Sequence, residues 1–220
     1  MGARIRWFIG LVLGLSLGIG MMGTAPAQEN AAPDPALSAV LAKLSDDPTS
    51  PQQYSANITL HVKLKVFPFI ALKLKGSSFY KRPGLYRFAF RGVPRAVDNF
   101  QNIAYDLGNP SVWGAKYTMA LLRPSAPGQD AIVRLTPKKR GMVKALDVSI
   151  DGTTGHMDSA VWSRFDSGTI TLHQRYAAVG DKVIVSHQEA TIAIPHMRAE
   201  LVADYTNFEL DADVSDTAQK

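Results

Sequence analysis

The chain of 220 residues contains no cysteine. This absence excludes disulfide bridges, thiolate metal sites and a cysteine nucleophile. It also excludes N-terminal lipidation, because the signal of a bacterial lipoprotein is cleaved at a cysteine. The protein therefore depends on its hydrophobic core alone for stability, and its length is sufficient for one domain with such a core.

A strong excess of charge of either sign is also missing. The formal net charge is +5, and it falls to +3 once Arg4 and Arg6 of the leader described below are removed. This charge is too small to predict nucleic-acid binding. The basic residues are instead concentrated in one stretch of the chain: Lys63, Lys65, Lys73, Lys75, Lys81, Arg82, Arg87, Arg91 and Arg95.

Long apolar runs are absent except at the start, where Trp7 to Met22 follows two arginines and precedes Ala25-Pro26-Ala27. This order is typical of a secretory signal peptide over residues 1–27, cleaved after Ala27. The alternative is an uncleaved anchor, but the run is shorter than the roughly 20 residues that a spanning helix needs. We therefore expect a periplasmic protein without a lipid anchor. It would have a mobile leader at 28–34, a single domain at 35–209 and a disordered acidic tail at 210–220.

The segment from Ile58 to Lys75 alternates apolar and polar residues, which predicts two antiparallel strands with one apolar face. A turn centred on Phe69 would pair Leu64 with Leu74 and Val66 with Leu72. The same register would place Lys63 opposite Lys75 and Lys65 opposite Lys73, where like charges repel. An apolar tip containing Phe67 and Phe69 between these lysines suggests contact with an anionic membrane or a partner protein. Its alternative is ordinary core beneath a helix.

The remaining pattern predicts a mainly antiparallel α+β fold. A short amphipathic helix is expected at 35–44 and another at 94–105, the latter carrying Phe100. Strands are expected around Tyr86, Phe88 and Phe90, at 117–122 and 131–135, and as a meander from 142 to 208 with turns at 151–152, 166–168, 180–181 and 195–196. Nine or ten strands in one sheet normally curl, which predicts a half-open barrel with short helices over its concave face.

The residue types that support catalysis occur without a convincing arrangement. His187 and Glu189 alternate on one strand, but the expected turn brings no third metal ligand to them. Asp147 is expected opposite His156, as a cross-strand ion pair rather than as part of a hydrolytic triad. The sequence therefore predicts neither an enzyme nor a metal site, and no cofactor.

Several motifs resemble the LolA/LolB outer-membrane lipoprotein-sorting superfamily. A signal peptide, a short helix and two long strands precede Phe79-Tyr80-Lys81-Arg82-Pro83-Gly84-Leu85-Tyr86-Arg87-Phe88. Later, Leu135-Thr136-Pro137-Lys138-Lys139 and Leu146-Asp147-Val148-Ser149-Ile150-Asp151 are similar to the two central strands of that superfamily. The resemblance implies an eleven-stranded half-barrel that carries acyl chains in a hydrophobic cavity, without a cofactor. Arg87 and Arg91 are candidates for the gating arginine of the carrier by strand position.

These observations lead to a monomeric periplasmic carrier of lipoprotein or lipid acyl chains as the first hypothesis. An inner-membrane transporter, an outer-membrane receptor and transient contact with an anionic membrane are its expected partners. The second hypothesis is a sensor or envelope adaptor with a filled core, and the third is a hydrolase built on His187, Glu189 or His156. The cavity of a carrier would be lined by Leu60, Val62, Leu64, Leu72, Leu74, Tyr86, Phe88, Phe90 and Phe100.

Overall fold

The computed structural model describes residues 34–45, 47–66, 69, 71–82, 85–91, 111, 113–126 and 129–211, with backbone only at 85, 86 and 91. The expected signal peptide, the helix at 94–105 and the tail from 212 lie outside these ranges. The last strand includes Leu210, the first residue of the segment expected to form the tail.

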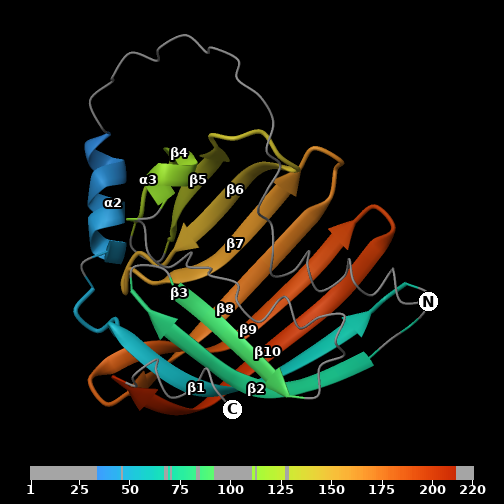
Figure 1. Ribbon diagram of the computed structural model, residues 1–220. Coiled ribbons are helices and arrows are strands. Elements are labelled where there is room, and N and C mark those ends of the chain that lie inside the picture. Colours follow the sequence, from blue (N-terminus) through green and yellow to red (C-terminus); the bar gives the residue numbers. More distant parts are fainter. Residues whose placement is uncertain are drawn as a thin grey trace.

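Ten strands form a single antiparallel sheet in the described part of the chain (Figure 1). Their order across the sheet is β3-β2-β1-β10-β9-β8-β7-β6-β5-β4. Their bounds are β1 Gln53–Leu64, β2 Ala71–Lys81, β3 Leu85–Arg91, β4 Tyr117–Arg123, β5 Ala131–Pro137, β6 Val143–Ile150, β7 Met157–Arg164, β8 Thr169–Val179, β9 Lys182–Ile194 and β10 Met197–Leu210.

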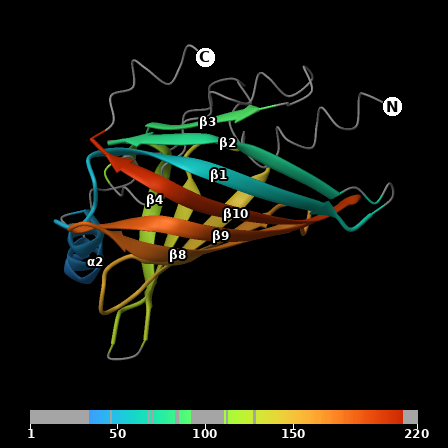
Figure 2. The same cartoon turned by 90° about the horizontal axis from the view of Figure 1, so that it is seen from below.

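The sheet curls strongly but does not close. Strand β4 runs at a steep angle to β1, β2 and β3 when the molecule is seen from below (Figure 2). Strands β3 and β4 stand at the two ends of the strand order, so the described residues form an open, curved sheet rather than a barrel. Alternation of apolar and polar residues gives the sheet one apolar face, which we call the concave face. The predicted fold class is confirmed.

Two short helices accompany the sheet. Helix α2, Pro35–Ser45, begins after Asp34, whose carboxylate accepts a hydrogen bond from the Ala36 amide at 2.9 Å. Asp34 is therefore the N-cap, with proline at the first helical position. Leu37, Val40 and Leu44 recur at helical spacing and are buried, as predicted. Helix α3, Trp113–Lys116, buries the ring of Trp113. Within the described ranges, neither helix has the length and hydrophobicity required to cross a membrane.

The register predicted for the first hairpin is wrong. Leu60 lies opposite Leu74 and Val62 opposite Leu72, a shift of four residues from the predicted pairs. The lysine pairs are therefore absent: Lys73 lies opposite His61 and Lys75 opposite Thr59. Strand β1 also pairs with β10, and the Lys65 amide donates a hydrogen bond to the Arg198 carbonyl at 2.8 Å. An even shift keeps every side chain on its predicted face.

The connection between β6 and β7 also differs from the prediction. The predicted two-residue turn at Asp151-Gly152 would pair Leu146 with Met157. In the structure residues 151–156 form the loop, and Leu146 lies opposite Trp162. The Asp151 carboxylate accepts hydrogen bonds from the amides of Thr153 and Thr154, at 2.8 and 2.5 Å, and Gly155 takes a φ of +77°. This side-chain turn competes with a tight hairpin, which explains the longer loop.

The remaining turns follow the prediction, with one irregularity. Turns occur at 166–168, 180–181 and 195–196, as expected. A bulge between Arg175 and Tyr176 shifts the β8–β9 register beyond it. The turn at 180–181 without a bulge would pair His187 with Gln174 and His173 with Gln188. With the bulge, His187 lies opposite Arg175 and His173 opposite Glu189. A bulge of one residue is not encoded by alternation, so the sequence pattern missed it.

Candidate functional site

The apolar residues predicted to line a cavity share the concave face. The β1–β2 register joins Leu60 to Leu74 and Val62 to Leu72, and the β2–β3 register places Phe88 opposite Ser78 and Phe90 opposite Gly76. Leu64 continues the same face of β1. Tyr86 lies opposite Tyr80 by its backbone, while its side chain is outside the description, as is Phe100. The structure therefore brings together seven of the eight predicted lining residues that lie on strands, from three neighbouring strands.

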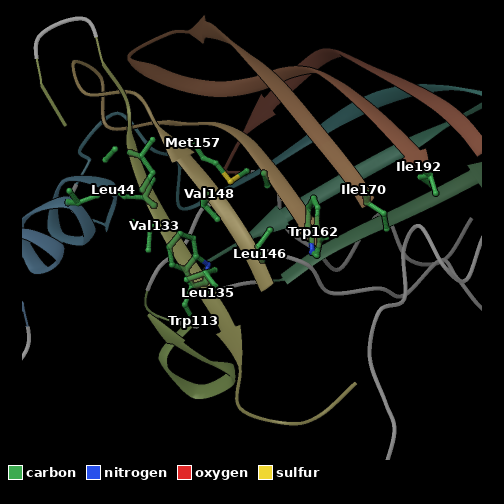
Figure 3. Close-up of a cluster of buried hydrophobic side chains, with 14 of the residues drawn as sticks. Leu44, Trp113, Val133, Leu135, Leu146, Val148, Met157, Trp162, Ile170 and Ile192 are labelled. Atoms are coloured by element: carbon green, nitrogen blue, oxygen red, sulfur yellow. The ribbon is translucent and has the colours of Figure 1, made fainter. Parts of the chain in front are cut away.

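Burial differs between the two halves of the concave face. Val133, Leu135, Leu146 and Val148 on β5 and β6 are 0 % exposed, and α2, α3 and strands β7 and β8 pack into the same cluster (Figure 3). On β1–β3, by contrast, Leu60, Leu64, Leu74, Phe88 and Phe90 are only half-buried, and Leu72 is 40 % exposed. Val62 on β1 is buried, as are Tyr54, Ala56, Ile58 and Tyr80, which lie farther from the β1–β2 connection. The β5–β8 half of the face is thus a fully packed core, which we call the finished core, while the β1–β3 half leaves apolar surface accessible.

The accessible half has its own aromatic cluster. Tyr54, Ala56, Ile58 and Tyr80 form its buried base, and Phe88 and Phe90 pack against this base. The rings of Phe88 and Phe90 stack with centroids 6.1 Å apart and an interplanar angle of 12°. Leu60 packs against this cluster and against the finished core, so it joins the two. Flat, half-buried rings beside aliphatic side chains form a surface that suits hydrocarbon.

A polar seam crosses the concave face between β8 and β10, and the sequence analysis missed it. Tyr205 donates its hydroxyl to Gln188 at 2.7 Å, Gln188 donates to Gln174 at 3.1 Å, and Gln174 donates to the Met157 carbonyl at 3.0 Å. Gln174 is 8 % exposed. Since buried amides require hydrogen-bond partners, the seam fixes these side chains in an otherwise apolar face. Two glutamines at matching strand positions were the only signal in the sequence.

The two arginines suggested as gating residues lie on β3. Arg87 lies opposite Phe79, on the face away from Phe88, and the side chain of Arg91 is outside the description. Arg164 instead continues the concave side of β7 beyond Trp162 and is 8 % exposed. Its guanidinium pairs with Asp166 at 2.7 Å, while Nη1 is buried without a hydrogen-bond partner in the described structure. A gating role for Arg87 or Arg91 stays a prediction.

The predicted contact residues of the first hairpin are accessible. Phe69 is 76 % exposed, and Lys63, Lys65, Lys73 and Lys75 are all exposed. Lys65 forms an ion pair with Glu200 at 2.9 Å. Phe67 lies outside the described residues. Their contact with a membrane or a partner protein stays a prediction.

The ion pair expected between Asp147 and His156 is wrong. His156 pairs with Asp47 at 2.8 Å, and Asp147 forms a two-pronged pair with Arg134 at 2.7 Å. Burial alone would raise the pKa of the Asp47 carboxyl. Hydrogen bonds from the Thr49 side chain and backbone, together with His156, outweigh burial and hold this pKa below its ordinary value.

His187 and Glu189 belong to a charged group on the convex face. His187 contacts Glu189 at 2.8 Å and Asp204 at 2.7 Å, and Arg175 contacts Glu189 at 2.7 Å. The hydrogen bonds to Glu189 and then to Asp204 raise the pKa of His187. Both imidazole nitrogens are engaged by carboxylates, which leaves neither as a free ligand or base in this arrangement.

A group of three carboxylates lies where β5 and β7 begin and β6 ends. Oxygens of Asp130, Asp151 and Asp158 are within 4.8 Å of one another. Ser149 donates to Asp130 at 2.8 Å, and Asp151 caps its own loop. Burial first, and then the charges of Asp130 and Asp151, raise the pKa of Asp158. These contacts explain the group as part of the loop structure.

Comparisons with known proteins support the fold. No protein-family model matches the sequence, and no curated protein matches it. The structure is similar to that of a DUF1329 family protein from Desulfovibrio piger, with a TM-score of 0.60 and 12 % identity over 83 % of this chain and 96 % of that one. A putative outer membrane lipoprotein-sorting protein domain from Vibrio parahaemolyticus aligns with a TM-score of 0.56 and 11 % identity, over 82 % and 93 %.

A LolA superfamily protein from Nitrosomonas europaea aligns more loosely, with a TM-score of 0.48 and 11 % identity over 80 % and 94 % of the two chains. At 11–12 % identity, the Desulfovibrio piger and Vibrio parahaemolyticus structures show a shared fold. The half-open fold that the sequence resemblance implied is thus confirmed.

Proposed function

We propose that this protein is a non-enzymatic periplasmic carrier that binds acyl chains of a lipoprotein or lipid on the β1–β3 half of its concave face. It would pass this cargo between the inner and outer membranes. The observation that carries the proposal is the contrast in burial within one face. Leu60, Leu72, Leu74, Phe88 and Phe90 leave apolar surface accessible beside a core in which equivalent residues are fully buried.

The energetics favour a hydrocarbon ligand. Removing apolar surface from water contributes roughly 25 cal/mol per Å², so burying about 200 Å² of an acyl chain would contribute about 5 kcal/mol. Neighbouring strands lie only about 4.8 Å apart, so one chain could contact side chains from β1, β2 and β3 together. Such binding needs neither a cofactor nor a catalytic group.

A fluorescent fatty acid titrated into the purified protein tests this proposal. We expect saturable binding that weakens by roughly tenfold in Phe88→Ala and in Phe90→Ala, since each change removes most of an aromatic contact surface. Leu122→Ala is the matched control, because Leu122 is exposed on β4 and alternates away from the concave face. Mass spectrometry of organic extracts would identify the native cargo. Absence of lipid from the extracts together with no titratable binding contradicts the proposal.

An envelope adaptor is the second candidate, favoured by the complete packing of the β5–β8 half. In that case the same fold would present a surface to another protein. A defined protein partner in affinity capture, combined with failure to bind any fatty acid or lipopeptide, would favour this candidate over the carrier.

A further inference from the structure

Four connections of the sheet lie along one edge, which we call the basic rim. They are the β1–β2, β5–β6, β7–β8 and β9–β10 connections. Strand direction alternates across the sheet, so β1, β5, β7 and β9 all end at this edge. Backbone hydrogen bonds link the rim: Lys65 donates to Arg198 at 2.8 Å and Phe165 donates to Met142 at 3.1 Å. Figure 1 shows the ends of the corresponding strands along the upper right of the sheet.

The charge of this rim is positive. Lys73, Lys138, Lys139, Arg140 and Arg198 are exposed there. The acidic residues described at the rim, Asp166 and Glu200, are both engaged in ion pairs, with Arg164 and Lys65 respectively. At the opposite edge carboxylates and basic residues occur together: Asp47, Asp130, Asp151, Asp181 and Asp211 share this edge with Lys43, Lys81, Arg82, Arg123 and Lys182. An excess of basic over acidic residues therefore distinguishes the basic rim.

The rim also carries most of the exposed large apolar residues. Phe69, Phe165 and Met142 are 76 %, 62 % and 51 % exposed, and Leu72 follows closely on β2. Of the large apolar residues found exposed in the described ranges, Leu122 alone lies toward the other edge. Exposed aromatic tips among cations have the composition of a surface that inserts into the headgroup region of an anionic bilayer.

The spacing of the tips favours a bilayer over a protein partner. Phe69 lies at the β1–β2 connection and Phe165 at the β7–β8 connection, with β10, β9 and β8 between β1 and β7. At about 4.8 Å per strand the tips are ~19 Å apart along the sheet. Separate apolar points do not form the contiguous patch that a protein interface requires, but each can enter a bilayer on its own.

We propose that the basic rim docks the protein onto an anionic membrane surface. Phe69, Met142 and Phe165 enter the headgroup region, and Lys139, Arg140 and Arg198 face the anionic headgroups. The accessible half of the concave face begins at this rim with Leu72, so the docked protein presents its apolar surface to the bilayer. That consequence rests on the proposed carrier function, whereas docking itself depends only on the rim.

Sedimentation with vesicles tests the docking. The purified mature protein should sediment with vesicles of equal parts phosphatidylglycerol and phosphatidylcholine, and should remain in solution with phosphatidylcholine alone. Binding should weaken as salt is added. Lys139→Glu combined with Arg140→Glu should reduce binding by roughly tenfold or more, since each basic residue near an anionic surface contributes to attraction. Lys81→Glu with Lys182→Glu makes the same charge change at the opposite edge and should reduce binding by less than about threefold.

The apolar contribution is tested separately. Phe69→Ser with Phe165→Ser should weaken vesicle binding, while Leu122→Ser should not. Circular dichroism checks that each variant is folded. Equal binding to both vesicle types, or equal loss in the rim and opposite-edge pairs, overturns docking. Fatty-acid titration without vesicles reports on the carrier function alone, so loss of that binding with docking retained overturns the proposed function instead.

Discussion

Asp47 connects three parts of the molecule through its carboxylate. It accepts hydrogen bonds from the Thr49 amide at 2.9 Å and the Thr49 hydroxyl at 2.6 Å, and it pairs with His156 at 2.8 Å. His156 in turn stacks on Tyr176, with ring centroids 4.6 Å apart. The segment after α2 is thereby fixed to the β6–β7 loop and, through Tyr176, to the polar seam, since Gln174 donates to the Tyr176 hydroxyl at 2.6 Å.

We therefore expect Asp47→Ala to destabilise the protein by about 1.5–3 kcal/mol, the range for hydrogen bonds to charged groups. Asp147→Ala is the control, because its pair with Arg134 is exposed and should contribute less than about 1 kcal/mol. Urea unfolding at neutral pH measures both. Losses of equal size would contradict the assignment of His156 to Asp47.

Because the pKa of Asp47 is lowered in the folded protein, the contribution of this carboxylate to stability depends on pH. A carboxyl whose folded pKa lies below its unfolded value stabilises the protein above the unfolded pKa, and this contribution disappears as the pH falls through the folded pKa. The destabilisation caused by Asp47→Ala should therefore shrink when unfolding is followed at progressively lower pH in the acid range.

Sequence reasoning could not find this pair. Asp47 and His156 are 109 positions apart, and their approach depends on α2 packing and on the length of the β6–β7 loop. The cap at Asp34, by contrast, depends on adjacent residues and could have been predicted from Asp-Pro at the start of a helical pattern.

At the scale of strands, Gly76 controls how β2 and β3 approach each other. It lies opposite Phe90, and a Cβ at this position would be 2.1 Å from the Ala89 carbonyl oxygen. The obstacle is backbone, which has no rotamer with which to move away. The missing side chain therefore allows the close approach that positions Phe88 and Phe90 on the concave face.

Gly76→Ala should separate the two strands, with a loss of about 1–3 kcal/mol typical of overpacked sites, and should also weaken fatty-acid binding. The control is Gly114→Ala in α3, where a Cβ meets nothing within 4 Å and alanine is intrinsically preferred in a helix. Thermal unfolding and the fatty-acid titration measure the two effects. Unchanged stability in Gly76→Ala would contradict this role of the glycine.

The positions of the strands along the chain were more predictable than the register in which the strands pair. The patterns at 117–122 and 131–135 gave β4 and β5 to within two residues of their observed bounds, because burial of one face leaves a period-two pattern in the sequence. Strand β1 begins five residues before the predicted segment, and β2 ends six residues after it. Register depends on turns and bulges, and the bulge near Arg175 and the loop after Asp151 changed it. The lining residues stayed on their predicted face because the error in the first hairpin was an even number of positions.

At the scale of the whole molecule, the two halves of the curved sheet differ in how completely their apolar side chains are buried. Its β5–β8 half is covered by α2 and α3 and has fully buried residues, while its β1–β3 half ends in the edge strand β3 and has half-buried apolar residues. The expected number of strands predicted that the sheet would curl. Only the structure distinguishes the fully packed β5–β8 half from the accessible β1–β3 half.

This difference predicts a gradient in hydrogen exchange. Backbone amides open most rarely where burial is complete, so those of β5–β7 should exchange at rates near the limit set by global unfolding, and those of β2 and β3 should exchange faster by local opening. Mass spectrometry of peptides after exchange in the ligand-free protein measures both regions in one experiment.

Adding a fatty acid should slow exchange in β1–β3 and leave β5–β7 unchanged, because hydrocarbon bound beside Phe88 and Phe90 would complete the unfinished half. Phe88→Ala combined with Phe90→Ala should show no such slowing at the same ligand concentration. Two outcomes contradict this view of the molecule. Equal protection of both halves without ligand would mean that the β1–β3 half is already complete, and protection confined to β5–β7 would place the ligand elsewhere.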